Sequence, residues 1–157
     1  METLDFLIDG FKVALTLENF TLALIGCILG TIFGALPGLG PANGVAILIP
    51  LSFSLGLSPA SSMILLASVY YGAMYGGRIS SILLNIPGDE PAMMTCLDGY
   101  PMTKQGRAGE ALTLTGLASF FGAMFATIGL VLLAPQLVKV ALLFGPVEYF
   151  ALFVMAF

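Results

Sequence analysis

The sequence has no histidine, only two cysteines and few charged side chains, and each scarcity excludes a class of function. Charged residues make up 9% of the chain, against about 25% in a typical soluble domain. Without histidine, Cys27 and Cys96 indicate neither a metal cluster nor a disulfide framework. No nucleophile motif is present either, so we expect no enzyme, no metal and no other cofactor. The lack of a basic stripe argues against nucleic acid as a partner.

The lack of charge is most pronounced from Asn19 to Gly77, where no Asp, Glu, Lys or Arg occurs. The mean hydropathy of the chain is +1.04 and 59% of its residues are hydrophobic. Since a spanning helix needs about 20 apolar residues, we predict an all-α, polytopic membrane protein in which residues 1–157 form a single transmembrane region. Apolar helices are expected over residues 20–36, 42–55, 60–76 and 109–133, the last ended by Pro135.

The two ends of the chain carry further signals. Residues 1–18 are acidic, so they do not resemble a secretory signal. Their apolar residues recur at helical spacing, which predicts an amphipathic interfacial helix. At the other end, only about a dozen apolar residues follow Pro146, fewer than the roughly 20 that a span needs. We therefore expect the chain to be the N-terminal part of a larger protein.

Proline and glycine interrupt the apolar sequence at two places. Pro37–Pro41, followed by Gly44, places two prolines and three glycines where an ordinary helix cannot continue. A second interruption, Pro87–Pro91, follows a short half-helix that starts at Arg78, and a further half-helix is expected from Pro91. Broken backbone at membrane depth is tolerated only where it is buried in protein or lines a cavity. Paired broken or re-entrant helices indicate a binding site in secondary transporters.

A helix that begins at such a break offers unpaired N–H groups and a partial positive charge, both of which favour an anion. Pro41 suits the first helical turn, and the amide of Asn43 would lie in that turn. The residues expected to bind substrate are Gly38, Leu39, Gly40, Pro41, Asn43, Gly44, Asn85, Pro87 and Gly88, together with Arg78. Asp89 and Glu90 are weaker candidates for binding a coupling cation or proton.

Each of these assignments has a purely structural alternative. The first break would serve equally as a tight turn at the membrane surface, Arg78 as an interfacial side chain that extends to the headgroups, and Asp89 as a helix cap. Glycines 26, 30, 34 and 38 form a small-residue stripe that lets another backbone approach closely. Residues 97–108 are expected to form a polar loop with a turn at Asp98 and Gly99. Lys104 and Arg107 favour a cytoplasmic position for that loop.

Several motifs together resemble the TctA family, the large membrane subunit of tripartite tricarboxylate transporters. The first motif is GALPGLGPANG at residues 34–44 with LIP at 48–50, and the second is YGAMYGG at 71–77, ILLNIPG at 82–88 and LDGYP at 97–101. The resemblance implies a multi-pass secondary transporter of the bacterial inner membrane, with this chain forming one half of an inverted repeat. Such a protein takes up tricarboxylates or related carboxylates from a periplasmic binding protein, works with a small membrane subunit, and is coupled to a Na⁺ or H⁺ gradient.

Two other functions remain compatible with the residues themselves. A channel would use the same broken helices as a pore, and a structural membrane subunit would contain no substrate site. The acidic pair Asp89 and Glu90 in the second break also leaves the identity of the carboxylate and of the coupling ion open.

Overall fold

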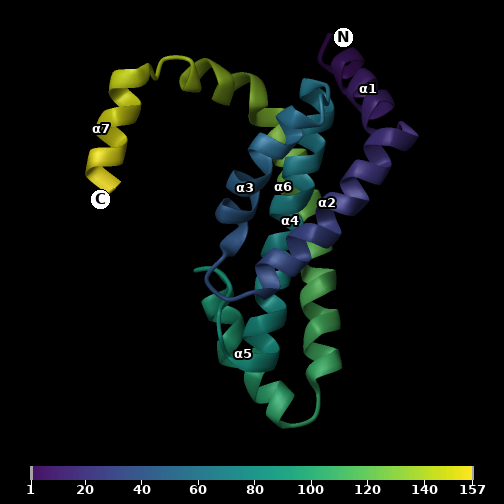
Figure 1. Cartoon of the computed structure of the whole chain (residues 1–157), viewed down its shortest axis with the longest axis vertical. Coiled ribbons are helices and arrows are strands. Elements are labelled where there is room, and N and C mark those ends of the chain that lie inside the picture. Colours follow the sequence, from purple (N-terminus) through teal and green to yellow (C-terminus); the bar gives the residue numbers. More distant parts are fainter. Residues whose placement is uncertain (1, 157) are drawn as a thin grey trace. The chain divides into compact units, whose positions relative to one another are not determined.

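The computed structural model describes residues 2–156, and the side chains of residues 7–134 and 136–155. The predicted all-α fold is confirmed, since the described residues form helices joined by short connections (Figure 1). The chain divides into two compact units, Met1–Gly116 (unit 1) and Leu117–Phe157 (unit 2). The helices are α1 (Glu2–Ala14), α2 (Leu17–Ala35), α3 (Gly40–Ser54), α4 (Pro59–Leu84), α5 (Ala92–Lys104), α6 (Ala108–Ala141) and α7 (Pro146–Ala156).

Helix α1 falls within the segment expected to be an amphipathic helix, apart from Met1, which lies outside the described residues. Helix α1 ends at Ala14, and α2 begins at Leu17. Between them, the hydroxyl of Thr16 caps α2 by accepting a hydrogen bond from Asn19 N at 3.4 Å. The side-chain amide of Asn19 donates to Val13 O at 2.8 Å, and this bond joins the end of α1 to the start of α2. Leu7, Ile8 and Phe11 are exposed. The interfacial position of this helix stays a prediction.

Helices α2 and α4 cross through small residues, as predicted for three of the four glycines of the stripe. The fourth, Gly38, lies beyond the end of α2, and a Cβ there would have no atom within 4 Å. A Cβ at Gly26 would lie 2.8 Å from Leu65 O, and Cβ atoms at Gly30 and Gly34 would overlap the backbone of Val69 and Ala73. These contacts advance in the same order along both helices, so α2 and α4 run parallel. Without side chains in the way, the two backbones reach van der Waals contact, which is how helices associate where no hydrophobic force drives them together.

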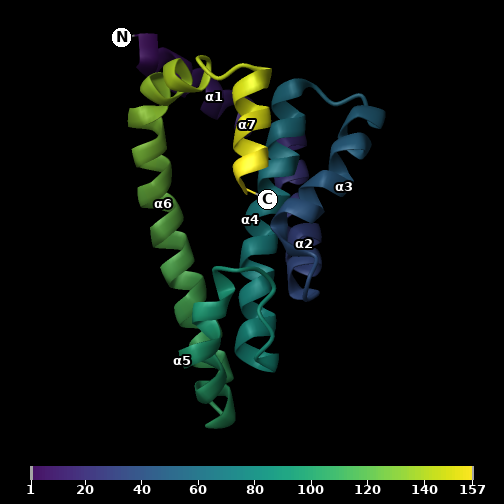
Figure 2. The same ribbon diagram turned by 90° about the vertical axis from the view of Figure 1, so that its left-hand side faces the viewer.

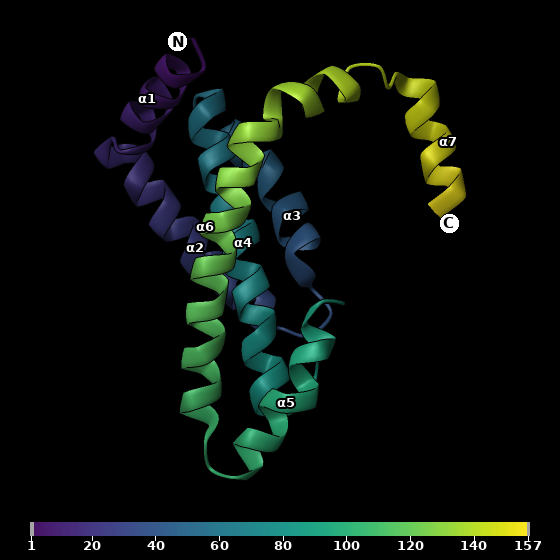
Figure 3. The same ribbon diagram turned by 180° about the vertical axis from the view of Figure 1, so that it is seen from behind.

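Helix α4 is the common neighbour of α2, α3 and α5 in unit 1. It packs against α2 and α3 along its first part and against α5 along its last part (Figures 2 and 3). Ser58 caps it and Pro59 occupies its first turn. The expected interruption between residues 76 and 78 is wrong, because α4 continues to Leu84 without a break. Gly76 and Gly77 are buried inside the helix, and tight packing, not chain reversal, explains their lack of side chains.

The predicted polar loop over residues 97–108 is also wrong, because most of it belongs to α5. Gly99 is buried, and a Cβ there would lie 2.7 Å from Ile82 Cγ1. Thr103 Oγ1 donates to Ile82 O at 2.7 Å and so fastens the end of α5 to α4. Packing of this small, polar face against α4 stabilises a helix that sequence propensity alone would not favour. Only residues 105–107 connect α5 to α6.

Helix α6 is longer than expected. It continues past position 135 to Ala141, so the prediction that Pro135 ends it is wrong. A proline removes a single backbone donor, and the helical bonding goes on to Leu142 N, which donates to Val138 O at 2.9 Å. In unit 2, α7 begins at Pro146, where Glu148 accepts from Gly145 N at 2.8 Å.

Two segments of the described chain have the length and apolar character of membrane-spanning helices. They are Leu17–Ala35 and Ala108–Ala134, with mean hydropathies of 1.6 and 2.2. Within the most apolar 18-residue window of the second segment, no residue is buried inside the structure. Helices α3 and α5, with 15 and 13 residues, are shorter than the roughly 20 residues that a span requires.

Candidate functional site at two helix breaks

The first break, Leu36–Leu39, connects α2 to α3. Gly38 and Gly40 have φ angles of +89° and +58°, and residues that carry a Cβ rarely adopt such angles. Helix α3 then begins at Gly40 with Pro41 in its first turn, and no side chain caps its N-terminus. The first turn of α3 therefore presents backbone N–H groups and the positive end of the helix dipole, and no described side chain caps them.

The second break, Asn85–Pro91, connects α4 to α5. Asn85 ends α4 in the left-handed conformation, with φ +58°, and its N–H donates to Ser81 O at 3.2 Å. Asp89 Oδ1 accepts a hydrogen bond from Ala92 N at 3.0 Å, so an acid caps the start of α5, as the sequence predicts. Asp89 Oδ2 is buried and has no hydrogen-bond partner among the described residues. Glu90 is exposed.

Gly88 brings the second break into contact with the crossing of α2 and α4. A Cβ at Gly88 would lie 2.5 Å from Gly77 Cα and 2.7 Å from Gly34 O. The carbonyl oxygen of Gly88 is 3.8 Å from the position of a Cβ at Gly40, the first residue of α3. The loop that precedes α3 and the loop that precedes α5 thus lie side by side (Figures 1 and 3).

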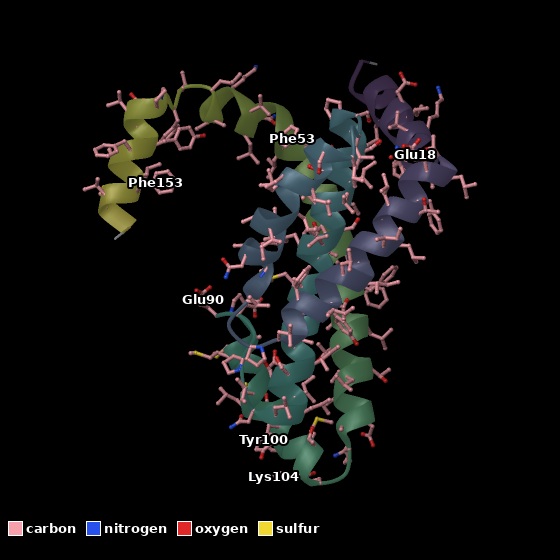
Figure 4. All side chains as sticks on the ribbon, viewed as in Figure 1. Glu18, Phe53, Glu90, Tyr100, Lys104 and Phe153 are labelled. Atoms are coloured by element: carbon pink, nitrogen blue, oxygen red, sulfur yellow. The ribbon has the colours of Figure 1, made fainter. Side chains whose placement is uncertain are left out.

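A cavity of about 430 Å³ lies between the two breaks. Among the described residues that line it, Asp89 and Glu90 are the ionisable ones, so these walls carry two carboxylates and no basic side chain. Glu90 lies at the tip of the second break, at a level between Phe53 near one end of unit 1 and Lys104 at the other (Figure 4). The lining residues are Gly38, Leu39, Gly40, Ala42, Asn43, Pro87, Gly88, Asp89, Glu90 and Met93.

Eight of the residues singled out in the sequence line this cavity, and four do not. Asn85 is exposed and serves as the C-cap of α4. Gly44 is buried and faces Val69 and Phe33, with 3.6 Å between the nearest side-chain atom and the position of its Cβ. Pro41 shapes the first turn of α3, and Arg78 is half-buried on α4 beside Gly77. A role for these four residues in binding stays a prediction.

Ala42 and Met93 are lining residues that the sequence analysis missed. Both lie in the first turn of a helix that begins at a break, which is the one signal that could have identified them. Among the described residues, no group of three or more Cys, Asp or Glu side chains is placed to hold a metal ion.

A helical membrane protein with a cavity between two helix breaks is the class that the fold and the site define. Residues 20–157 match the tripartite tricarboxylate transporter TctA family, and the chain belongs to that family. The family consists of transporter components rather than enzymes.

Two relatives are consistent with this membership. An uncharacterised 52.8 kDa protein encoded in the TAR-I ttuC′ 3′ region of Agrobacterium vitis is 46% identical over 155 residues, which are 99% of this chain and 30% of the relative. An uncharacterised protein of Methanocaldococcus jannaschii is 32% identical over 108 residues, 68% of this chain and 26% of the relative. The chain thus spans less than a third of the length of either relative. No solved structure matches it.

Proposed function

We propose that this chain carries part of the substrate site of a secondary transporter for tricarboxylates or related carboxylates, and that the anion binds in the cavity between the two breaks. The observation that carries the proposal is that two segments about 50 residues apart line one cavity. Its volume of about 430 Å³ lies within the range of about 300–1,000 Å³ for small-molecule sites. Membership of the TctA family supports the substrate class.

The start of α3 is the part of the cavity best suited to a carboxylate. No side chain caps that helix, and Gly40 and Asn43 both line the cavity. Glycine lets an anion reach the backbone N–H groups, and the helix dipole adds attraction. The amide of Asn43 supplies a further donor. The start of α5 is less suitable, because Asp89 already occupies its first N–H position.

Asp89 and Glu90 are proposed to bind the coupling cation or proton. A carboxylate substrate in this cavity lies near two protein carboxylates, and the resulting repulsion is relieved when a cation or proton enters with it. This arrangement makes substrate affinity depend on the coupling ion and the ion affinity depend on substrate, as linkage requires. Na⁺ and H⁺ are the two ions that the family resemblance implies.

The remaining features of the proposal follow from the family. We infer a multi-pass position in the bacterial inner membrane, delivery of substrate by a periplasmic binding protein, and assembly with a small membrane subunit. The breaks lie between the two ends of unit 1 in Figure 4, which agrees with the midplane sites of transporters built from inverted repeats.

Uptake of labelled carboxylates into membrane vesicles that contain the full-length protein tests the proposal. Asn43→Ala removes the amide that lines the cavity, whereas Asn85→Gly removes an amide outside it and keeps the left-handed backbone of the α4 C-cap. We expect Asn43→Ala to raise the substrate KM and Asn85→Gly to leave it unchanged. A wild-type KM for Asn43→Ala at normal protein abundance would show that Asn43 does not contribute to the substrate site.

A further inference from the structure

We propose that Gly88 is a positioning residue: it seats the second break against the crossing of α2 and α4, and so sets the distance between the two walls of the cavity. The expected change in KM rests on the proposed function above. The expected change in the position of the second break, measured by cysteine labelling, does not. Of the three glycines that line the cavity, Gly88 is the one at which a Cβ would meet the backbones of two helices.

The contact leaves no space for a side chain. A Cβ at Gly88 would meet Gly77 Cα at 2.5 Å and Gly34 O at 2.7 Å. Both are backbone atoms, which cannot rotate aside as a flexible side chain would. Gly34 and Gly77 are themselves buried, and Gly34 is in turn packed against the backbone of Ala73. Any substituent at position 88 must therefore push the second break away from the helices.

Displacement of Gly88 changes the cavity directly. The carbonyl oxygen of Gly88 faces Gly40 of the opposite wall, 3.8 Å from the position of a Cβ there. The next residue, Asp89, has its Oδ1 atom 3.4 Å from the position of a Cβ at Gly77, and that oxygen caps α5. Moving the break by the width of a methyl group thus shifts one wall of the cavity and the carboxylate of Asp89 together.

The effect is expected to stay local, because α5 has a second attachment to α4. Thr103 Oγ1 donates to Ile82 O at 2.7 Å, and Gly99 packs on Ile82. These contacts lie near the far end of α5 and do not involve the break. Gly88 therefore sets the position of the second break, while Thr103 and Gly99 hold α5 against α4. A substitution at Gly88 should accordingly move the break without unfolding α5, as a positioning role requires.

The test is Gly88→Ala in the full-length protein, with KM and maximal uptake measured separately. We expect KM to rise about tenfold or more with a smaller change in maximal uptake, since displacement of a site by about 1 Å has effects of up to about 100-fold. Gly116→Ala is the control, because Gly116 is a helical glycine outside the cavity, and a Cβ there would lie 3.6 Å from Tyr75 Oη, an ordinary contact distance. It should leave KM unchanged.

A second readout does not depend on transport. In a background with Cys27→Ser and Cys96→Ser, the rate of maleimide labelling at Ala42→Cys, on the wall opposite the second break, should change with Gly88→Ala and not with Gly116→Ala. An unchanged labelling rate and an unchanged KM overturn the positioning role. A changed labelling rate in a protein that takes up no carboxylate leaves the positioning role standing and refutes the proposed function.

Gly77→Ala keeps the inference testable if Gly88→Ala does not accumulate in the membrane. A Cβ at Gly77 would lie 3.4 Å from both Gly88 Cα and Asp89 Oδ1, at the boundary between ordinary and tight contact. It presses on the same break from the α4 side without overlap, so we expect normal abundance, a measurable change in labelling at Ala42→Cys, and a smaller rise in KM. Wild-type values for both overturn the proposal.

Discussion

The two breaks follow the same pattern of proline and glycine, yet they present opposite electrostatic surfaces to the cavity between them. The first break leaves the N-terminus of α3 without a side-chain cap. The second caps α5 with Asp89 and adds the exposed carboxylate of Glu90. The same proline and glycine pattern therefore gives a first break that attracts an anion and a second break that repels one. The residues that follow the Pro-Gly pair decide the role of each break.

The two breaks also differ in how they are held. Gly88 of the second break contacts the backbones of both α2 and α4, whereas a Cβ at Gly38 of the first break would have no atom within 4 Å. The second break is thus fixed by packing against its neighbours, while the first is shaped mainly by its own backbone dihedral angles. This difference predicts that substitutions in the second break act through contacts, and those in the first through charge and strain.

The strongest test of the electrostatic contrast is Asn43→Asp. It places a carboxylate in the first turn of α3, where an acid stabilises a helix, so folding and abundance should not suffer. The same charge repels a carboxylate substrate within the cavity. We expect KM to rise at least about tenfold, equivalent to about 1.4 kcal/mol, as measured by uptake at graded substrate concentration.

Asn85→Asp is the control for Asn43→Asp, because it adds the same charge to the other break at an exposed position outside the cavity. Its KM should stay near that of the wild type. If Asn43→Asp and Asn85→Asp raise KM equally, the added negative charge acts on the substrate from either position, and the start of α3 is not the anion site.

The next test removes the charge of the second break and keeps its geometry. Asp89→Asn retains an oxygen that accepts from Ala92 N, and asparagine caps helices about as well as aspartate. If Asp89 holds the coupling ion, stimulation of uptake by the cation or by low pH should fall at least about fivefold, the lower end of typical coupling between sites. Glu90→Gln, at the exposed tip of the same break, should have a smaller effect. Unaltered ion dependence in Asp89→Asn excludes Asp89 as the coupling residue.

The sequence was sufficient to predict the elements that depend on local chemistry. The breaks, the cap of α5, and the small-residue face of α2 follow from proline, glycine and aspartate at particular positions. The pattern shared by Pro37–Pro41 and Pro87–Pro91 was enough to place eight of the ten lining residues in the candidate site.

The remaining features depend on contacts between segments that are distant in the sequence. Gly76 and Gly77 look like a break until the backbones that pack on them are known, and residues 97–104 look like a loop until Gly99 meets Ile82. Asn85 ends α4 with a left-handed backbone, a conformation that asparagine tolerates better than most residues, and a role for it in binding stays a prediction. At Gly76, Gly77 and Gly99, tertiary packing overrides local preference.

A smaller effect is expected from strain in the first break. Gly40→Ala forces a Cβ into a φ of +58°, and Gly56→Ala does the same at +64° in the α3–α4 turn, outside the cavity. Each should lower the free energy of unfolding by about 1–2 kcal/mol, measured by thermal unfolding in detergent. Gly40→Ala should also raise KM several-fold, because its methyl group faces Gly88 O across the cavity at 3.8 Å. Gly56→Ala should leave KM unchanged. Equal KM values in the two variants would show that the first break does not contact the substrate.

The smallest effect on transport is expected at the far attachment of α5. Thr103→Val keeps the shape of the side chain and removes the hydroxyl that donates to Ile82 O at 2.7 Å, at a cost of about 1 kcal/mol in unfolding free energy. Thr113→Val is the control, since its hydroxyl donates only to Gly109 O within its own exposed turn. We expect a lower Tm for Thr103→Val alone and a wild-type KM for both. A KM for Thr103→Val as high as that of Gly88→Ala would mean that the whole length of α5, and not the contact at Gly88, positions the second wall.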